Sequence, residues 1–137
     1  MGRNHTAAAF RFALDLHSGV PVYRQLIDQV RGAMAAGSLT AGDQLPTVRQ
    51  LAVDLAINPN TVMRAYRELE LTGLLETHQG TGTFISDKKL ERKSAERDRQ
   101  LSQIAAESAA RAGAAGFSVE DLVQRLRELL PAPAQRR

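Results

Sequence analysis

The chain of 137 residues has no cysteine and no tryptophan, and aromatic residues make up only 4% of it. Without cysteine it forms neither disulfides nor thiolate metal sites. The core must therefore be built from Leu, Val, Ile and Ala, a composition that suits the packing of small helices.

Long apolar runs are missing as well. No stretch approaches the ~18–20 apolar residues that a membrane-spanning helix needs. Near the start, Arg11 and Asp15 interrupt the apolar residues before the core of a secretion signal of usual length can form. We therefore expect a soluble, cytoplasmic protein without a membrane partner.

Residues that would carry catalysis or hold a cofactor are scarce. The three histidines, His5, His17 and His78, share no metal-ligand spacing. No Gly-rich loop is followed by Lys-Ser or Lys-Thr, as in a nucleotide-binding P-loop, and no serine or acid belongs to a constellation in which a base orients a nucleophile. The sequence predicts no enzyme, no metal and no cofactor.

The charge of the chain is +3 with a pI of about 9.8, which invites a nucleic-acid interpretation. Residues 21–86, however, carry five basic and six acidic side chains, a net charge of −1, and the excess lies in residues 87–137. Net charge therefore does not establish DNA binding here, and the argument depends on the helix face that each arginine occupies.

Phe12, Leu14 and Leu16 alternate as in a short strand. Start and stop signals for three helices follow between residues 18 and 73. Pro21 then suits the first turn of a helix that ends near Gly37. One face of this helix carries the apolar stripe Tyr23, Leu26, Ile27, Val30 and Met34.

Residues 42–46 have the composition of a turn, and two further helices follow. Thr47 and Gln50 have the spacing of a capping box, which predicts a helix over about 47–56. Asn58 as N-cap with Pro59 at the first helical position predicts a helix over 58–72, which Gly73 ends in a left-handed conformation.

Two strand candidates, 74–79 and 83–86, are joined by Gly80-Thr81-Gly82 and predict a hairpin, or wing. Two short helices, a tight turn and a hairpin in this order are typical of a winged helix-turn-helix. The predicted fold class is mainly α with a small β wing.

In a helix-turn-helix the second helix lies in the major groove of DNA. Asn60, Thr61 and Arg64 share the face opposite the apolar stripe of helix 58–72, and Arg and Asn are the side chains that clasp guanine and adenine. Arg49 is placed to contact the adjoining backbone. The candidate DNA-binding residues are Thr47, Arg49, Asn58, Asn60, Thr61, Arg64, Arg67, His78, Gly80 and Thr81.

Plainer interpretations stay open for each feature taken alone. Outward Thr, Asn and Arg side chains on a helix are commonly just solvated, and Gly80-Thr81-Gly82 is also what a simple tight turn requires. The order of the elements favours DNA binding.

The chain resembles the GntR family of winged-helix regulators over about residues 12–86. The matching motifs are Val20-Pro21-Val22-Tyr23-Arg24-Gln25-Leu26, Gly42-Asp43-Gln44-Leu45-Pro46-Thr47-Val48-Arg49-Gln50-Leu51-Ala52, Asn58-Pro59-Asn60-Thr61-Val62 and Gly80-Thr81-Gly82-Thr83-Phe84. The resemblance implies a homodimer on a palindromic operator. It places Arg49, Asn60, Thr61, Arg64, Gly80 and Thr81 at family contact positions. Pro59 and Met63 stand where many relatives have a basic residue.

The short remainder resembles the YtrA-like branch, whose C-terminal part is a small helical dimerisation unit. After a charged stretch from Asp87, an apolar stripe begins at Leu101 and Ile104, and Gly113 and Gly116 break it. The last helix has Ser118 as N-cap with Asp121 at the reciprocal position, and Phe117 is placed to pack on Leu122.

The stripe of the last helix comprises Leu122, Leu126, Leu129 and Leu130, which with Leu101 and Ile104 are the candidate dimerisation residues. Two helices with such narrow stripes bury too little to form a core of their own. A second copy of the chain and the winged domain of the same chain are both possible partners, and we favour the second copy.

The sequence thus predicts a flexible arm at 1–11, a DNA-binding domain at 12–86, a helical dimerisation region at 87–130 and a disordered tail at 131–137. The favoured function is a homodimeric repressor that reads double-stranded DNA, with any small-molecule effector unknown. The alternative is a winged-helix module that binds proteins, or nucleic acid without sequence preference.

Overall fold

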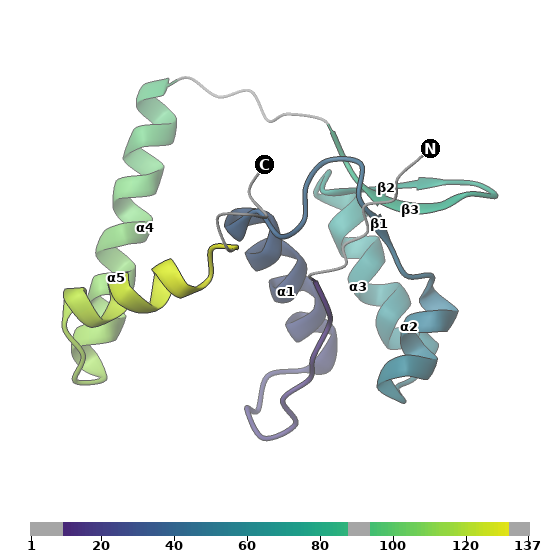
Figure 1. The fold of residues 1–137 in the computed structure, drawn as a ribbon, viewed down its shortest axis with the longest axis horizontal. Coiled ribbons are helices and arrows are strands. Elements are labelled where there is room, and N and C mark those ends of the chain that lie inside the picture. Colours follow the sequence, from purple (N-terminus) through teal and green to yellow (C-terminus); the bar gives the residue numbers. More distant parts are fainter. Residues whose placement is uncertain (1–9, 88–93, 132–137) are drawn as a thin grey trace. The chain divides into compact units, whose positions relative to one another are not determined.

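The computed structural model describes residues 10–87 and 94–131, and the chain divides into two compact units, Met1–Lys88 and Lys89–Arg137 (Figure 1). The predicted arm and tail lie almost wholly outside the described residues. No helix within the described ranges is both long enough and apolar enough to cross a membrane.

The first unit contains three helices and a small sheet. Its elements are α1 (Val22–Ala36), β1 (Gln44–Leu45), α2 (Val48–Leu55), α3 (Pro59–Leu71), β2 (Leu75–His78) and β3 (Gly82–Ile85). The strands are antiparallel in the order β1-β3-β2, and α3 contacts α1, α2 and β2. The predicted fold class, mainly helical with a small β wing, is confirmed.

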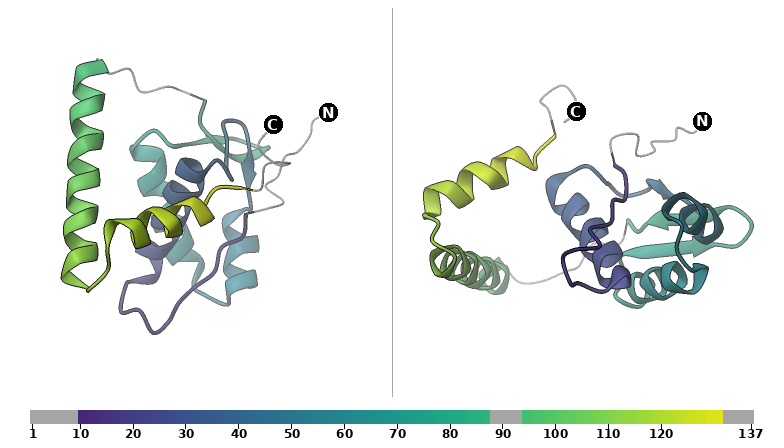
Figure 2. Two further views of the ribbon diagram at one scale, coloured as in Figure 1. Left: turned by 60° about the vertical axis from the view of Figure 1, so that its left-hand side comes forward. Right: turned by 90° about the horizontal axis from the view of Figure 1, so that it is seen from below.

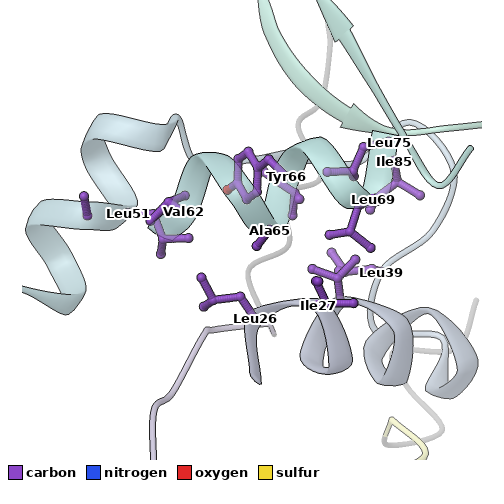
Figure 3. Close-up of a cluster of buried hydrophobic side chains, with 13 residues drawn as sticks. Leu26, Ile27, Leu39, Leu51, Val62, Ala65, Tyr66, Leu69, Leu75 and Ile85 are labelled. Atoms are coloured by element: carbon purple, nitrogen blue, oxygen red, sulfur yellow. The ribbon is translucent and has the colours of Figure 1, made fainter. Parts of the chain in front are cut away.

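The core of this unit lies where α3 meets α1, as the labelled side chains in Figure 3 show. Its thirteen buried apolar side chains are Leu26, Ile27, Val30, Leu39, Leu45, Leu51, Ala52, Val62, Ala65, Tyr66, Leu69, Leu75 and Ile85. Because the buried residues of α1 and α3 recur at three- and four-residue steps, each helix turns one stripe inward and leaves the opposite face in solvent.

The helix ends follow the predicted capping signals. Thr47 and Gln50 form both hydrogen bonds of the capping box, and the Asn58 side chain accepts from the Asn60 N–H at 2.8 Å. Gly73 is left-handed, with the Leu74 N–H donating to the Leu69 carbonyl as in a Schellman motif.

The turn between α2 and α3 needs a left-handed residue too. Ala56 adopts this conformation, with φ 57° and ψ 48°, and among the described residues it is the one non-glycine with positive φ. The side chain of alanine makes this conformation costly. The turn therefore stores a small strain at the centre of the helix-turn-helix.

Residues 12–16 do not form the predicted strand. Leu16 begins a turn, and the backbone of Ala13 and Asp15 pairs with glutamine side chains of α1 instead of a neighbouring strand. The side-chain amide of Gln25 accepts from the Asp15 N–H and donates to the Asp15 carbonyl, at 2.9 and 3.0 Å. Gln29 makes the same pair of bonds with Ala13. Gln25 and Gln29 are four residues apart, a rise of about 6 Å along the helix. Asp15 and Ala13 are two residues apart, about 6–7 Å along an extended chain, so each glutamine lies beside its own partner.

The predicted turn at residues 42–46 contains a strand that the sequence did not reveal. Gln44 and Leu45 of β1 pair with Phe84 and Thr83 of β3. A two-residue strand shows no alternation that could be detected, and its partner lies far along the chain. The result is a three-stranded sheet in place of a free hairpin.

The second unit consists of α4 (Ser94–Ala114) and α5 (Val119–Glu128), which a short turn joins at an angle (Figure 2). Ser118 and Asp121 form the predicted capping box of α5. Gly113 lies within α4, because glycine is tolerated within a helix at a modest cost. The chain reverses at Gly116, which has φ 89°.

Candidate nucleic-acid interface

The polar face of α3 is open to solvent along the first two turns of the helix. Asn60 and Arg64 are exposed and Thr61 is half-buried, while Val62 and Ala65 on the opposite face are fully buried. Arg67 continues the exposed face one turn further along. The structure thus brings three of the predicted base-reading residues together on one surface.

Two other predicted contact residues are already engaged in helix caps. The Thr47 hydroxyl accepts from the Gln50 N–H at 3.0 Å, and the Asn58 carbonyl oxygen caps α3. Both side chains are exposed. The amide NH₂ of Asn58 can still donate outward, whereas the Thr47 hydroxyl donates to the side-chain carbonyl oxygen of Gln50 at 3.5 Å.

The three arginines predicted to contact DNA have no acidic partner among the described residues. No carboxylate of the described residues lies within ion-pairing distance of Arg49, Arg64 or Arg67. Arg49 is exposed on the first turn of α2. Local charge therefore favours an anionic partner, although residues 21–86 sum to −1.

Arg64 does not extend freely into solvent. Its guanidinium carbon lies 3.7 Å from the centroid of the Tyr23 ring on α1, and that of Arg24 lies 5.6 Å from the same centroid. Sequence reasoning assigned Tyr23 to the core stripe of α1 and missed this contact. No local signal could have revealed it, because it joins two helices that are distant in sequence.

The wing is a tight hairpin with a positive φ at Gly80 and Gly82. Thr81 is exposed at its tip, and its N–H donates to the His78 carbonyl at 2.9 Å. The Gln44 side-chain amide donates to the Thr81 carbonyl at 3.1 Å and lies so close to Gly82 that a Cβ there would meet it. Gln44 is thus a wing-supporting residue that sequence reasoning missed.

His78, predicted to face a phosphate, has an acidic neighbour. Its Nε2 lies 3.4 Å from a Glu76 carboxylate oxygen, and its ring meets the Phe84 ring edge-on at 5.4 Å between centroids. Glu76 also accepts from the Ser86 hydroxyl at 2.9 Å. The imidazole therefore belongs to a contact network on one face of the wing.

Buried chemistry in this unit is structural. Tyr66 donates its hydroxyl to the Pro46 carbonyl at 2.7 Å, and burial raises its pKa, so it stays protonated. Within the described ranges, no three His, Cys, Asp or Glu side chains gather as a metal site. The site offers hydrogen-bond donors and cations.

In the second unit the predicted dimerisation residues remain largely in solvent. Leu122 is half-buried, whereas 65% of Leu101, 51% of Ile104 and 51% of Leu126 are exposed, and Leu129 and Leu130 are exposed as well. Leu122 and Phe117 line a mainly apolar groove of about 640 Å³ between α4 and α5. Among the described residues of the second unit, no other side chain of that unit covers this apolar surface.

Comparison with known proteins agrees with the fold. The family profile described as "Bacterial regulatory proteins, gntR family" matches residues 22–85. The HTH-type transcriptional repressor YtrA of Bacillus subtilis (strain 168) is 46% identical over 74 residues, which are 54% of this chain and 57% of that protein. The chain thus spans little more than half the length of the curated relatives it matches.

Two solved structures are similar over nearly their whole length. YtrA from Sulfolobus acidocaldarius, a GntR-family transcription factor, is 30% identical with a TM-score of 0.54, covering 72% of this chain and 97% of that one. A transcriptional regulator from Oenococcus oeni is 34% identical with a TM-score of 0.54, covering 87% and 98%. The resemblance inferred from the motifs is confirmed, and the chain belongs to the GntR family of bacterial regulatory proteins.

Proposed function

We propose that the protein is a homodimeric transcription repressor that binds a palindromic operator. In this proposal α3 lies in the major groove, and the wing, residues 74–86, lies on the adjoining backbone or minor groove. The observation that carries it is the exposed polar face of Asn60, Thr61 and Arg64, opposite a fully buried stripe and without a carboxylate partner within the described residues.

The side chains on this face have the chemistry of base readout. Arginine can donate two parallel hydrogen bonds to guanine O6 and N7, and asparagine can bond adenine N6 and N7. Arg49, at the start of α2, has the position of a phosphate contact, which adds affinity without sequence information. Arg64 and Asn60 are therefore proposed to specify sequence, and Arg49 to position the domain.

The dimer is supported by the uncovered apolar surface of α4 and α5. Leu101 and Ile104 of α4, Leu126 of α5, and Leu129 and Leu130 directly after α5 are exposed, and contiguous apolar surface of this kind is typical of interaction surfaces. A second copy is a suitable partner, because two identical readers about 34 Å apart match half-sites one helical turn apart. The repressor role is supported by the similarity to YtrA of Bacillus subtilis, which is a transcriptional repressor.

Selection of bound duplexes from a random DNA pool, followed by competition at fixed salt, tests the proposal. We expect enrichment of a two-fold symmetric sequence that binds more tightly than random duplex.

Arg64→Ala should weaken binding to the selected site by about 1–3 kcal/mol and relax preference at one base position. Arg49→Ala should weaken all duplexes similarly and flatten the salt dependence.

Equal affinity for selected and random duplexes would overturn the proposal. It would favour the second candidate, a winged-helix module that binds nucleic acid without sequence preference or binds protein. The net charge of −1 over residues 21–86 favours that candidate, because non-specific DNA binding rests on positive charge.

A further inference from the structure

Tyr23 connects α1 to the exposed face of α3 through the Arg64 side chain. The ring is half-buried and packs against the core, while Arg64 is exposed. The guanidinium carbon of Arg64 lies 3.7 Å from the ring centroid, well inside the ~6 Å within which a cation is attracted to an aromatic face. A ring packed against the core thus contacts a side chain at the solvent-exposed surface.

The short distance defines how the guanidinium lies on the ring. A guanidinium with an N–H aimed at the ring would hold its central carbon farther out, so Arg64 presents its face to Tyr23. The five N–H donors of arginine lie in the guanidinium plane. Stacking on the face therefore leaves the donor fork unoccupied.

The surroundings do not compete for that fork. Ion pairs within the described residues involve neither Arg64 nor Arg24, whose guanidinium carbon is 5.6 Å from the same ring. A carboxylate partner would occupy the donors that a base edge needs, whereas an aromatic ring does not. A free arginine side chain carries about 2 kcal/mol of rotamer entropy. Because the ring already restricts Arg64, less of this entropy is lost when the side chain binds a base.

We propose that Tyr23 is a positioning residue for base readout, which holds the Arg64 guanidinium by its face and turns the donor fork toward a guanine in the major groove. The proposal rests on the proposed function, because it assumes that α3 reads DNA. It assigns a role in specificity to a residue of α1 that does not itself need to touch a base.

A double-mutant cycle tests this proposal with five proteins: wild type, Tyr23→Phe, Tyr23→Leu, Arg64→Ala and the Tyr23→Leu/Arg64→Ala double variant. Each is titrated with the selected operator, with the operator altered at the base whose preference Arg64→Ala relaxes, and with random duplex. Discrimination is the ratio of the first two affinities. Urea unfolding confirms that each protein is folded, and Tyr23→Met replaces Tyr23→Leu if the latter is not.

We expect Arg64→Ala to lose about 5- to 150-fold in discrimination, the range of a good bidentate contact. Tyr23→Leu should lose about two- to fivefold, as for an exposed cation–π contact, and Tyr23→Phe should retain wild-type discrimination within twofold. In the Arg64→Ala background, Tyr23→Leu should change discrimination no further. Affinity for random duplex should remain unchanged by the Tyr23 variants.

Full discrimination in Tyr23→Leu, or an equal loss with and without Arg64, would overturn the positioning role while leaving the proposed function intact. A wild-type protein that does not distinguish the selected operator from random duplex would overturn both. The two failures are therefore distinguishable in one set of titrations.

Discussion

The two units of the chain differ in how many apolar side chains they bury. The first packs thirteen apolar side chains among three helices and a sheet, whereas no side chain of the second is buried among residues 95–131. Both begin helices with a capping box, so the difference does not lie in local helix signals. It lies in whether the unit itself supplies the apolar surface that each of its helices must cover.

This difference separates the roles we propose for the units. A self-sufficient core can hold the α3 face and the wing in fixed geometry, which base readout requires. A pair of helices with exposed leucines acquires its stability from contacts outside itself, which suits a unit that joins two copies. Substitutions should therefore affect folding in the first unit and association in the second.

The largest expected effect is on the core of the first unit. Leu26→Ala should lower the free energy of unfolding by about 2–5 kcal/mol, because it opens a cavity at a fully buried position. Urea denaturation measures the loss, which should not depend on protein concentration. Leu16→Ala, at a position 76% exposed, is the control and should stay within about 0.5 kcal/mol. Equal effects would contradict the description of this core.

The next effect is on association through α5. Leu126→Asp should turn the proposed dimer into a monomer in sedimentation velocity, since a carboxylate would have to be desolvated in an apolar interface. Leu71→Asp makes the same chemical change at a leucine that is 81% exposed in the first unit, and it should leave the dimer intact. A dimer that survives Leu126→Asp would move the interface elsewhere.

A smaller effect concerns the segment that pairs with α1. Gln25 is buried and forms hydrogen bonds with Asp15, Ser18 and Val20. Gln25→Met keeps much of the shape but removes these bonds, and should cost about 1–3 kcal/mol in urea unfolding. Gln29→Met, whose bonds to Ala13 are exposed, should cost less. A larger loss for Gln29→Met would show that burial does not decide the strength of this pairing.

A gain of stability is expected at the turn of the helix-turn-helix. Ala56→Gly should stabilise the first unit by about 0.5–1 kcal/mol, because glycine adopts φ 57° without the steric cost that alanine carries. Ala35→Gly, at a helical position in the last turn of α1, should instead destabilise it, by up to about 1 kcal/mol. Thermal unfolding of both variants gives the signs, and a loss for Ala56→Gly would refute the strain.

The smallest effect distinguishes the two capping boxes by pH. Hydrogen bonds from the Ser118 backbone N–H and then its side chain hold the pKa of Asp121 below the usual range of an aspartate. The folded state therefore gains stability above the ordinary aspartate pKa, and it loses this gain as pH falls through the lowered pKa. The Gln50 amide in the cap of α2 does not titrate.

Amide hydrogen exchange of α5 as a function of pH, compared with exchange in α2, measures this difference. Protection of α5 should fall in acid in the wild type once the intrinsic pH dependence of exchange is subtracted. Asp121→Asn, which keeps an acceptor without a titrating group, should remove the acid step. The same step in α2 would contradict an origin in Asp121.

The predictable part of this structure is the part that depends on near neighbours in sequence. The three N-caps at Thr47, Asn58 and Ser118, and the inward stripes of α1 and α3, were all predicted because each is set within a few residues. The exposed face of α3 followed from the same periodicity.

Contacts between distant segments were not predictable in this way. The strand β1, the pairing of Gln25 and Gln29 with residues 13–15, and the Gln44 bond to Thr81 all depend on where the chain returns in space. The stacking of Arg64 on Tyr23 belongs to the same class. The sequence predicted correctly that Arg64 is exposed, but not that a ring of α1 contacts its guanidinium.

The central claim is that the exposed face of α3 enters a DNA groove, and NMR tests it most directly. Backbone amides and the side-chain signals of Asn60 and Arg64 are followed while the selected duplex is added at fixed salt. We predict that the largest shifts fall on Asn60, Thr61, Arg64 and the wing tip at Thr81, and that signals of the α5 stripe do not change. Shifts confined to α4 and α5, with Asn60 and Arg64 unperturbed by bound duplex, would contradict the account.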